Sequence, residues 1–81
     1  MLISRYFLHL REGADVALDP GGIECASVEQ LRQAVLWNAR DVIAGDALSG
    51  TIHLNFRIDA EGQSGAVVHT LSFADAVAII R

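Results

Sequence analysis

One long amphipathic helix is the feature that most constrains how this chain folds. Ser27 is followed three residues later by Gln30, which is the spacing of a capping box at a helix N-terminus. A helical hydrophobic period continues over residues 28–44, and Gly45 is a typical C-terminal stop. At about 100° per residue, one arc of this helix gathers its apolar residues. We expect this core face to consist of Val28, Leu31, Val35, Ala39 and Val42, with Leu36 and Ile43 at its edge.

The segment before the helix alternates with a period of two, which predicts a β-hairpin. Over residues 2–11, Tyr6 and three leucines share one side of the strand, and His9 and two arginines share the other. The turn signal Glu12-Gly13 and the apolar residues 16–18 complete the hairpin. We therefore expect the leucine side to be buried.

The segment after the helix predicts the clearest strand. Residues 51–59 alternate almost perfectly between apolar and polar side chains. We expect residues 66–72 to return beside this strand after a hairpin loop, with Asp59 opposite Ala66. In this register, the side that faces the helix consists of Ile52, Leu54, Phe56 and Ile58 together with Val67 and Leu71.

Residues 73–80 predict a short final helix with Ser72 as its N-cap. We therefore expect an α+β fold in a single domain over residues 1–81. The elements follow the order β-β-α-β-β with a short C-terminal helix, and a small antiparallel sheet carries the one long helix on one face.

The charge of the chain argues against nucleic acid as a partner. The net charge is −4, and the six basic residues are all arginines without a cluster. Proteins that bind a duplex depend on lysines and arginines that neutralise phosphates, so we expect no direct nucleic-acid binding. The N-terminus has no signal-peptide pattern, and no apolar run is long enough to cross a bilayer. We expect a cytoplasmic protein without membrane contact.

No motif predicts a cofactor, a metal site or a catalytic group. The expected register points His69 toward the core and His53 toward solvent, so these residues and His9 do not meet. Cys25 is the one cysteine, and we expect it to be a small buried hydrophobe rather than a nucleophile. Four acidic residues surround two turns without the spacing of an EF-hand: Glu12, Asp15, Asp19 and Glu24. We therefore expect no enzyme activity.

Three stretches carry a resemblance to a known family: Arg5-Tyr6-Phe7-Leu8-His9-Leu10, Asp19-Pro20-Gly21-Gly22-Ile23-Glu24 and Leu71-Ser72-Phe73-Ala74-Asp75-Ala76. Their order and spacing resemble short bacterial proteins known only as a domain of unknown function. Members begin R-Y-F, carry D-x-x-G-x-E before an alanine-rich helix and end with L-P-F-x-D-A. Ser72 stands in place of the usual proline, and the loop 61–65 is longer than usual. The resemblance spans essentially the whole chain and implies no activity or functional residue.

The stretch from Tyr6 to Val42 is also similar to HicB-type antitoxins. It has a hairpin, a D-x-P-G-like turn, a short apolar strand and a helix start like S/T-x-E-E-A. This second resemblance implies a protein that binds and neutralises a small RNA-cleaving toxin. The acidic charge and small size fit this role, and the second half of the chain fits it less well.

Trp37 lies on the polar side of the predicted helix, about 180° from Val28. Tryptophan is enriched at interface hot spots, so we expect Trp37, Leu36 and Arg40 to form an interface. A closed two-fold homodimer is the commonest way to cover such a patch, and another protein is the other partner. Alternatively, the C-terminal segment or the first hairpin loop covers the ring within one chain. We interpret the chain as a noncatalytic protein-interaction module that self-associates, with a HicB-like antitoxin as the alternative.

Overall fold

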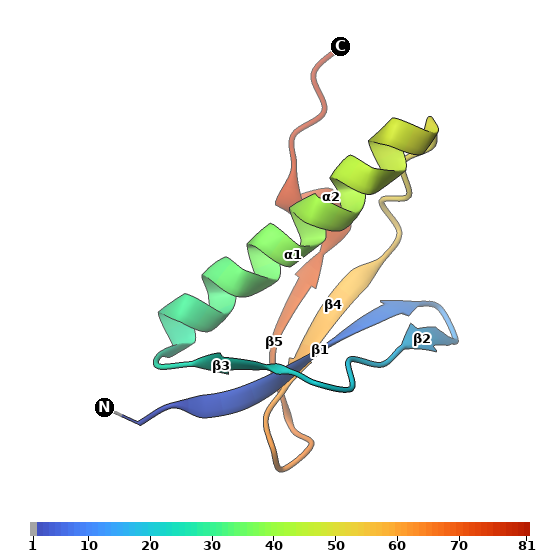
Figure 1. Cartoon of the computed structure of the whole chain (residues 1–81). Coiled ribbons are helices and arrows are strands. Elements are labelled where there is room, and N and C mark those ends of the chain that lie inside the picture. The colour runs from blue at the N-terminus through green and yellow to red at the C-terminus, as the bar shows by residue number, and fades with distance from the viewer. Residues whose placement is uncertain (1) are drawn as a thin grey trace.

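The computed structural model describes residues 2–81 and shows an α+β fold (Figure 1). A small antiparallel sheet carries one long helix on one face, as predicted, and the sheet has five strands. The elements are β1 (Ser4–Glu12), β2 (Asp15–Ala17), β3 (Ile23–Cys25), α1 (Val28–Ser49), β4 (Arg57–Glu61), β5 (Val67–Ser72) and α2 (Phe73–Ala76). The predicted order of elements was incomplete, because it contained no strand corresponding to β3.

β1 is the central strand of the sheet. One of its edges pairs with β4, and the other pairs with β2 and β3 at its two ends. Leu8 is buried, and Tyr6 and Leu10 pack against the same core. The period of two therefore predicted the buried side of β1 correctly. Leu2 is the exception, because it lies before the strand and is exposed.

β3 forms because a tight turn brings the chain back against the start of β1. Tyr6 pairs with Ile23, and Ser4 pairs with Cys25. Gly22, which precedes the strand, has a φ of 67°, and a Cβ there would lie 2.6 Å from the carbonyl oxygen of Tyr6. Only glycine permits this conformation and this approach. Three residues are too few for a period, so pattern analysis did not predict the strand.

The N-terminus of α1 matches the prediction. Ser27 Oγ accepts a hydrogen bond from the backbone N–H of Gln30 at 3.1 Å, and Gln30 Oε1 accepts one from the N–H of Ala26 at 2.7 Å. The buried face of the helix consists of Leu31, Val35, Ala39 and Ile43, with Leu36 and Val42 partly buried. Val28 was wrongly assigned to this face, because the first turn lies at the rim of the sheet and leaves Val28 exposed.

The predicted stop of α1 at Gly45 is wrong. The helix continues to Ser49, and Gly50, with a φ of 93°, caps it by donating its N–H to the carbonyl of Ala47 at 3.1 Å. A glycine inside a helix costs about 1 kcal/mol, which is too little to end a helix that gains further hydrogen bonds. The last turns of α1 consequently extend beyond the sheet (Figure 1).

The strand predicted over residues 51–59 is wrong for its first six residues. Residues 51–56 form an irregular connection, and β4 begins at Arg57. Because α1 ends beyond the sheet, this segment has to lead the chain back to it. Ile52 is exposed as a result, whereas Leu54 and Phe56 remain partly buried against the core.

β4 and β5 pair in a different register from the predicted one, but the same residues face the helix. Asp59 lies opposite Thr70 instead of Ala66, and Ala60 lies opposite His69. A shift by an even number of residues leaves every side chain on its expected face. A bulge after Ala60 then breaks the alternation and leaves Val67 exposed, contrary to the prediction.

The final helix is shorter than expected. α2 ends at Ala76 instead of residue 80, and the Ser72 side chain makes no cap hydrogen bond. Phe73 is fully buried, whereas Ile80 is 90% exposed. The tail after α2 therefore does not form the predicted apolar helical face.

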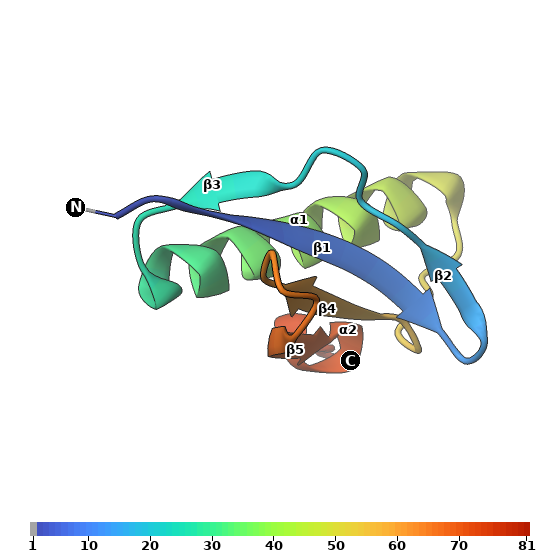
Figure 2. The same cartoon turned by 90° about the horizontal axis from the view of Figure 1, so that it is seen from below.

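One hydrophobic cluster joins α1 to the sheet. Its buried members are Leu8, Cys25, Leu31, Val35, Ala39, Ile43, Ile58, Ala60, Phe73 and Ala76. In Figure 2, which is seen from below, β3 lies along one side of α1 and α2 lies along the other side. The sheet and these two short elements cover the inner side of the helix, and its outer side faces away from them.

Candidate interaction surface

The exposed side of α1 carries the residues best placed to meet a partner. We call it the outer face and define it by five exposed residues: Trp37, Arg40, Asp41, Ala44 and Leu48. Trp37 is 66% exposed and Leu48 is 92% exposed. The helix presents these side chains opposite its buried stripe because about 100° separates consecutive residues. The alternative of intrachain packing requires another segment to cover the Trp37 ring. Within residues 2–81, no segment does so, because the side chain is 66% exposed.

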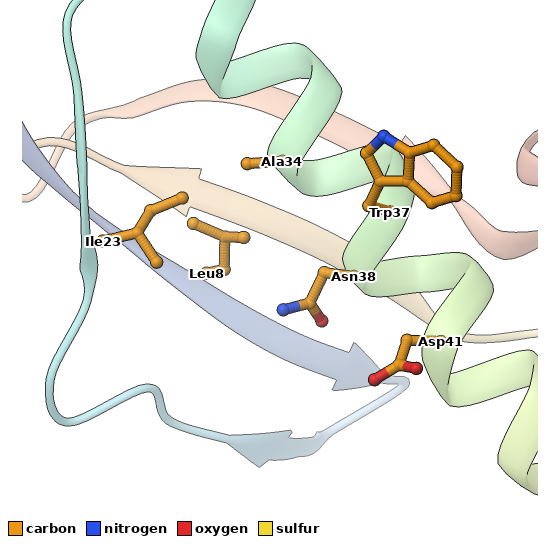
Figure 3. Close-up of a pocket in the computed structure, with 6 residues that line it drawn as sticks. All are labelled: Leu8, Ile23, Ala34, Trp37, Asn38 and Asp41. Carbon is orange, nitrogen blue, oxygen red and sulfur yellow. The ribbon is translucent and has the colours of Figure 1, made fainter.

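A groove runs along one flank of the outer face, between α1 and the sheet. It has a volume of about 370 Å³ and is lined by Leu8, Ile23, Ala34, Trp37, Asn38 and Asp41. In Figure 3, Ala34 and Asn38 reach into the groove from α1, and Ile23 and Leu8 lie across from them on β3 and β1. The Trp37 ring lies at the side farthest from Ile23. The residues that line the groove from the sheet, Leu8 and Ile23, are apolar, whereas Asn38 and Asp41 add polar groups from α1.

A second depression lies on the outer face itself. It has a volume of about 230 Å³ and is lined by Trp37, Arg40, Asp41 and Ala44. These four residues follow one another at helical spacing, so the depression is a hollow between side chains of one helix. Both concave sites therefore share Trp37 and Asp41, but only the second lies wholly on the side of α1 that faces away from the core, because the core residue Leu8 and its neighbour Ile23 line the first.

The three interface residues predicted from the sequence have different environments. Trp37 and Arg40 are exposed, whereas Leu36 packs partly against the core and is less accessible to a partner. Arg40 Nε donates a hydrogen bond to the carbonyl of Ala76 at 2.8 Å, which ties the outer face to the end of α2. The sequence analysis did not assign Ala44 and Leu48 to this surface, because it ended the helix at Ala44. Both residues follow Trp37 at a helical spacing, and this spacing was the signal that could have identified them.

The opposite face of the sheet carries a network of charged residues. Asp59, which is 6% exposed, lies 2.8 Å from Arg11 Nε and 3.3 Å from Arg57 Nε, and it accepts a hydrogen bond from Thr70 at 2.9 Å. Burial raises the pKa of Asp59, but the bonds from Thr70 and Arg57 and the charges of Arg57 and Arg11 outweigh it and lower the pKa overall. The network satisfies its own charges and leaves Asp59 little accessible to a ligand.

Asp19 stabilises the turn that leads into β3. Its carboxylate accepts hydrogen bonds from the backbone N–H groups of Leu8, Gly21 and Gly22 at 3.1, 3.3 and 3.1 Å. Burial raises the pKa of Asp19, but these bonds and the nearby His9 lower it overall. The Asp19 carboxylate therefore stabilises the turn itself, and these hydrogen bonds explain why an acidic residue occupies this position.

The histidines and the cysteine lie in separate places. His9 Nδ1 accepts a hydrogen bond from the Asp19 N–H at 3.1 Å, His53 lies 3.1 Å from Asp46, and His69 is partly buried on β5. Within residues 2–81, no three histidine, cysteine or acidic side chains are grouped to hold a metal ion. Cys25 is 5% exposed, and burial raises the pKa of its thiol, which disfavours the nucleophilic thiolate.

None of the helices in the described part of the chain has both the length and the apolar character needed to cross a bilayer. Among protein families, the model described as "Domain of unknown function (DUF6894)" matches residues 5–74. No curated protein and no solved structure matches the chain.

Proposed function

Because the chain belongs to the DUF6894 family, whose function is unknown, we propose a function from its surface: it is a noncatalytic cytoplasmic module that self-associates through the outer face of α1. The observation that carries this proposal is the position of Trp37. Its side chain is 66% exposed on a regular helix, opposite the core, with Ala44 and Leu48 on the same side. Large aromatic residues in such positions are typical of interface hot spots.

A rigid helix makes Trp37 an efficient anchor. The backbone of α1 is held by packing along its other side, so binding does not have to order it. The side chain has only two rotatable bonds, so little entropy is lost when it is buried. The adjoining groove of about 370 Å³ gives the partner a concave surface beside the ring.

The size of the protein supports self-association. A chain of this length buries a modest fraction of its surface, and small proteins without disulfides or metals often gain stability by forming oligomers. The one cysteine excludes a disulfide within the chain. A two-fold dimer removes the exposed aromatic surface from water without any further component.

The charged groups support a noncatalytic role and a protein partner. The lowered pKa values of Asp19 and Asp59 arise from bonds that stabilise the fold, and neither carboxylate lies in the groove. Three of the six arginines, Arg5, Arg11 and Arg57, are paired with acidic side chains. A surface with this charge pattern has few free cations to neutralise phosphates, so nucleic acid is not the proposed partner.

Analytical ultracentrifugation tests the proposal. We expect the wild type to be dimeric at tens of micromolar and Trp37→Ala to weaken association at least about tenfold, since hot-spot truncations cost more than about 1.4 kcal/mol. Arg32→Ala is the matched control, because Arg32 is exposed on α1 outside the outer face. A monomeric wild type at about 100 μM, or equal affinity in the two variants, contradicts the proposal.

Fluorescence gives an independent measurement, because Trp37 is the one tryptophan of the chain. Its emission should shift to shorter wavelength as the protein concentration passes through the dissociation constant. Arg32→Ala should show the same shift. Emission that is independent of concentration, in a protein that sediments as a dimer, would place the interface elsewhere.

A second candidate function is a HicB-like antitoxin. The order hairpin, turn, short strand β3 and Ser27-capped helix agrees with the elements of that resemblance over Tyr6 to Val42. The net charge of −4 suits a basic partner. A stable complex with a small basic RNA-cleaving protein encoded beside it, with loss of the RNA cleavage, would support this role over self-association alone.

A further inference from the structure

We propose that β5 of one copy pairs with β5 of a second copy, so that the two sheets join into one continuous sheet across a two-fold axis. The pairing uses the edge of β5 that does not meet β4, which we call the free edge. This inference goes beyond the proposed function, because the free edge is separate from the outer face of α1. Three observations carry it: the unpaired backbone groups of β5, the contrast between the two edges of the sheet, and the side chains of β5.

The free edge presents unpaired backbone donors and acceptors. Within residues 2–81, β4 is the only strand that pairs with β5. The N–H of Phe73 donates a hydrogen bond to the carbonyl of Phe56 at 2.9 Å, which continues the register of this pair. Successive residues of an antiparallel strand direct their backbone groups alternately toward and away from the neighbouring strand. Ser72 and Thr70 therefore direct their N–H groups away from β4.

The opposite edge of the sheet is protected against a further strand. It is formed by β2 and β3, which have three residues each and carry the acidic residues Asp15 and Glu24. Between these two strands, the Asp19 carboxylate accepts a hydrogen bond from the N–H of Leu8 at 3.1 Å, so a side chain takes the place of a strand. Short strands and charged residues are common protections of an exposed edge.

β5 has almost none of these protections. Its six residues, Val67–Ser72, include no charged residue and no proline. Val67 and Val68 are 52% and 53% exposed. The bulge after Ala60 affects the start of the strand, and the residues from His69 onward keep a regular register with β4. The free edge is therefore open to a second strand along most of its length.

The side chains of β5 fit an identical strand. Since the strand carries no charge, two copies meet without repulsion between like charges. In an antiparallel pair centred on Thr70, the two copies of Thr70 exchange two backbone hydrogen bonds, and Val68 of each copy lies beside Ser72 of the other. Threonine opposite threonine is a favourable cross-strand pair. The Thr70 hydroxyl donates to Asp59 at 2.9 Å, on the face of the sheet, so it does not obstruct the edge.

This arrangement is compatible with contact through α1. A two-fold axis between antiparallel edge strands runs perpendicular to the sheet, so the two α1 helices lie on the same face of the joined sheet. Their outer faces point away from the sheet and stay accessible. An edge contact of this length buries little side-chain area, so we expect it to be weaker than the α1 contact, with a dissociation constant of about 0.1–1 mM.

Amide hydrogen exchange measured by NMR tests the pairing. The variant Trp37→Ala is the background, because it weakens the α1 contact and isolates β5. Between about 0.05 and about 2 mM protein, exchange at the N–H groups of Thr70 and Ser72 should slow at least about twofold, because pairing removes them from water. The N–H of Leu71, which lies opposite Ile58 and points toward β4, is the internal control and should not change.

The variant Ser72→Pro removes one donor from the free edge. Ser72 has a φ of −75°, which proline adopts without strain, and its side chain makes no cap hydrogen bond. The variant should therefore keep the circular dichroism spectrum of its Trp37→Ala parent and weaken the pairing at least about tenfold, because the proline ring also occupies the space of the partner strand. Ser72→Ala is the matched control. It keeps the N–H and should match the parent to within about twofold.

A mixture of isotopically labelled and unlabelled protein tests the register. The antiparallel pair predicts contacts between Val68 of one copy and Ser72 of the other. Contacts between the two copies of Val68 would indicate a parallel pair. Contacts from β5 to residues 77–81 of the other copy would mean that this segment occupies the edge. Either result overturns the proposed pairing.

The outcomes separate this inference from the proposed function. Protection of Thr70 that Ser72→Pro abolishes and Ser72→Ala retains supports the β5 pair, whatever the state of Trp37. Exchange that is unchanged up to about 2 mM, or equal behaviour of the two Ser72 variants, overturns the β5 pair and leaves the α1 contact untouched. Failure of the α1 contact appears instead in the sedimentation and Trp37 emission of the wild type at tens of micromolar.

Discussion

Arg11 of β1 and Asp59 of β4 lie diagonally across neighbouring strands, with Arg11 Nε 2.8 Å from Asp59 Oδ2 on the side of the sheet away from α1. Asp59 is almost fully buried beneath the arginines that neutralise it. The side of the sheet that lacks a helix is therefore closed by ion pairs and not by a second apolar layer.

This relationship predicts how stability depends on pH. The pKa of Asp59 is lower in the folded protein than its ordinary value, so its contribution is complete above the unfolded-state pKa of about 4. The contribution is lost as the pH falls from there through the lower folded-state pKa. We expect the free energy of unfolding to decrease as the pH falls below about 4, with Asp19 adding to the same trend.

The variant Asp59→Asn isolates this contribution. It should be less stable than the wild type at neutral pH by about 1–3 kcal/mol and should show a flatter pH profile in urea titrations. Asp15→Asn is the control, since Asp15 is exposed on β2. A variant profile parallel to that of the wild type would show that Asp59 does not cause the acid sensitivity.

Phe73 and Phe56 should differ in their effects on stability. Phe73 is fully buried, and its ring centroid lies 5.7 Å from that of Phe56, which is only partly buried. We expect Phe73→Ala to cost about 3–5 kcal/mol and Phe56→Ala clearly less, because less surface leaves water at Phe56. Chemical denaturation measures both. Equal costs would mean that residues 51–56 pack more tightly than the structure shows.

Two glycines of α1 should respond in opposite directions to alanine. Gly45 lies inside the helix with open space around its Cα, so Gly45→Ala should stabilise the protein by about 0.5–1 kcal/mol. Gly50 has a φ of 93°, so Gly50→Ala should destabilise it, by about 1 kcal/mol or more. Thermal melting of both variants tests where the helix ends. Stabilisation by Gly50→Ala would contradict the left-handed cap.

Folding should be independent of metal ions. Asp19, at the turn before β3, accepts hydrogen bonds from three backbone N–H groups, and within residues 2–81 no three histidine, cysteine or acidic side chains are grouped to hold a metal ion. We therefore expect melting curves recorded with and without a strong chelator to coincide. A lower midpoint with chelator, reversed by one divalent metal, would reveal a stabilising site.

Local sequence predicted those parts of the fold that depend on local interactions. The Ser27 cap involves atoms within four residues, and the helical stripe from Leu31 to Ile43 requires only a period and a core to face. The period of two placed Leu8 and Ile58 on the buried side for the same reason. The exposed position of Trp37 followed from counting around the helix, so the central residue of the candidate surface was predictable.

Contacts between distant segments decided the rest. The sequence offers two glycines, Gly45 and Gly50, as the end of α1. The helix ends at the later one, which places Leu48 on the outer face and leaves residues 51–56 as a connection. The bulge after Ala60, the strand β3 and the short α2 likewise depend on which segment each one meets.

The sequence by itself therefore determined which residues face the core and where the long helix begins, because these properties repeat with the geometry of a single element. Only the tertiary structure decided where that helix stops, how β4 and β5 are aligned, and which side chains join Trp37 at the surface. Each of these depends on small energy differences between local alternatives, and packing against the rest of the chain is large enough to select one of them.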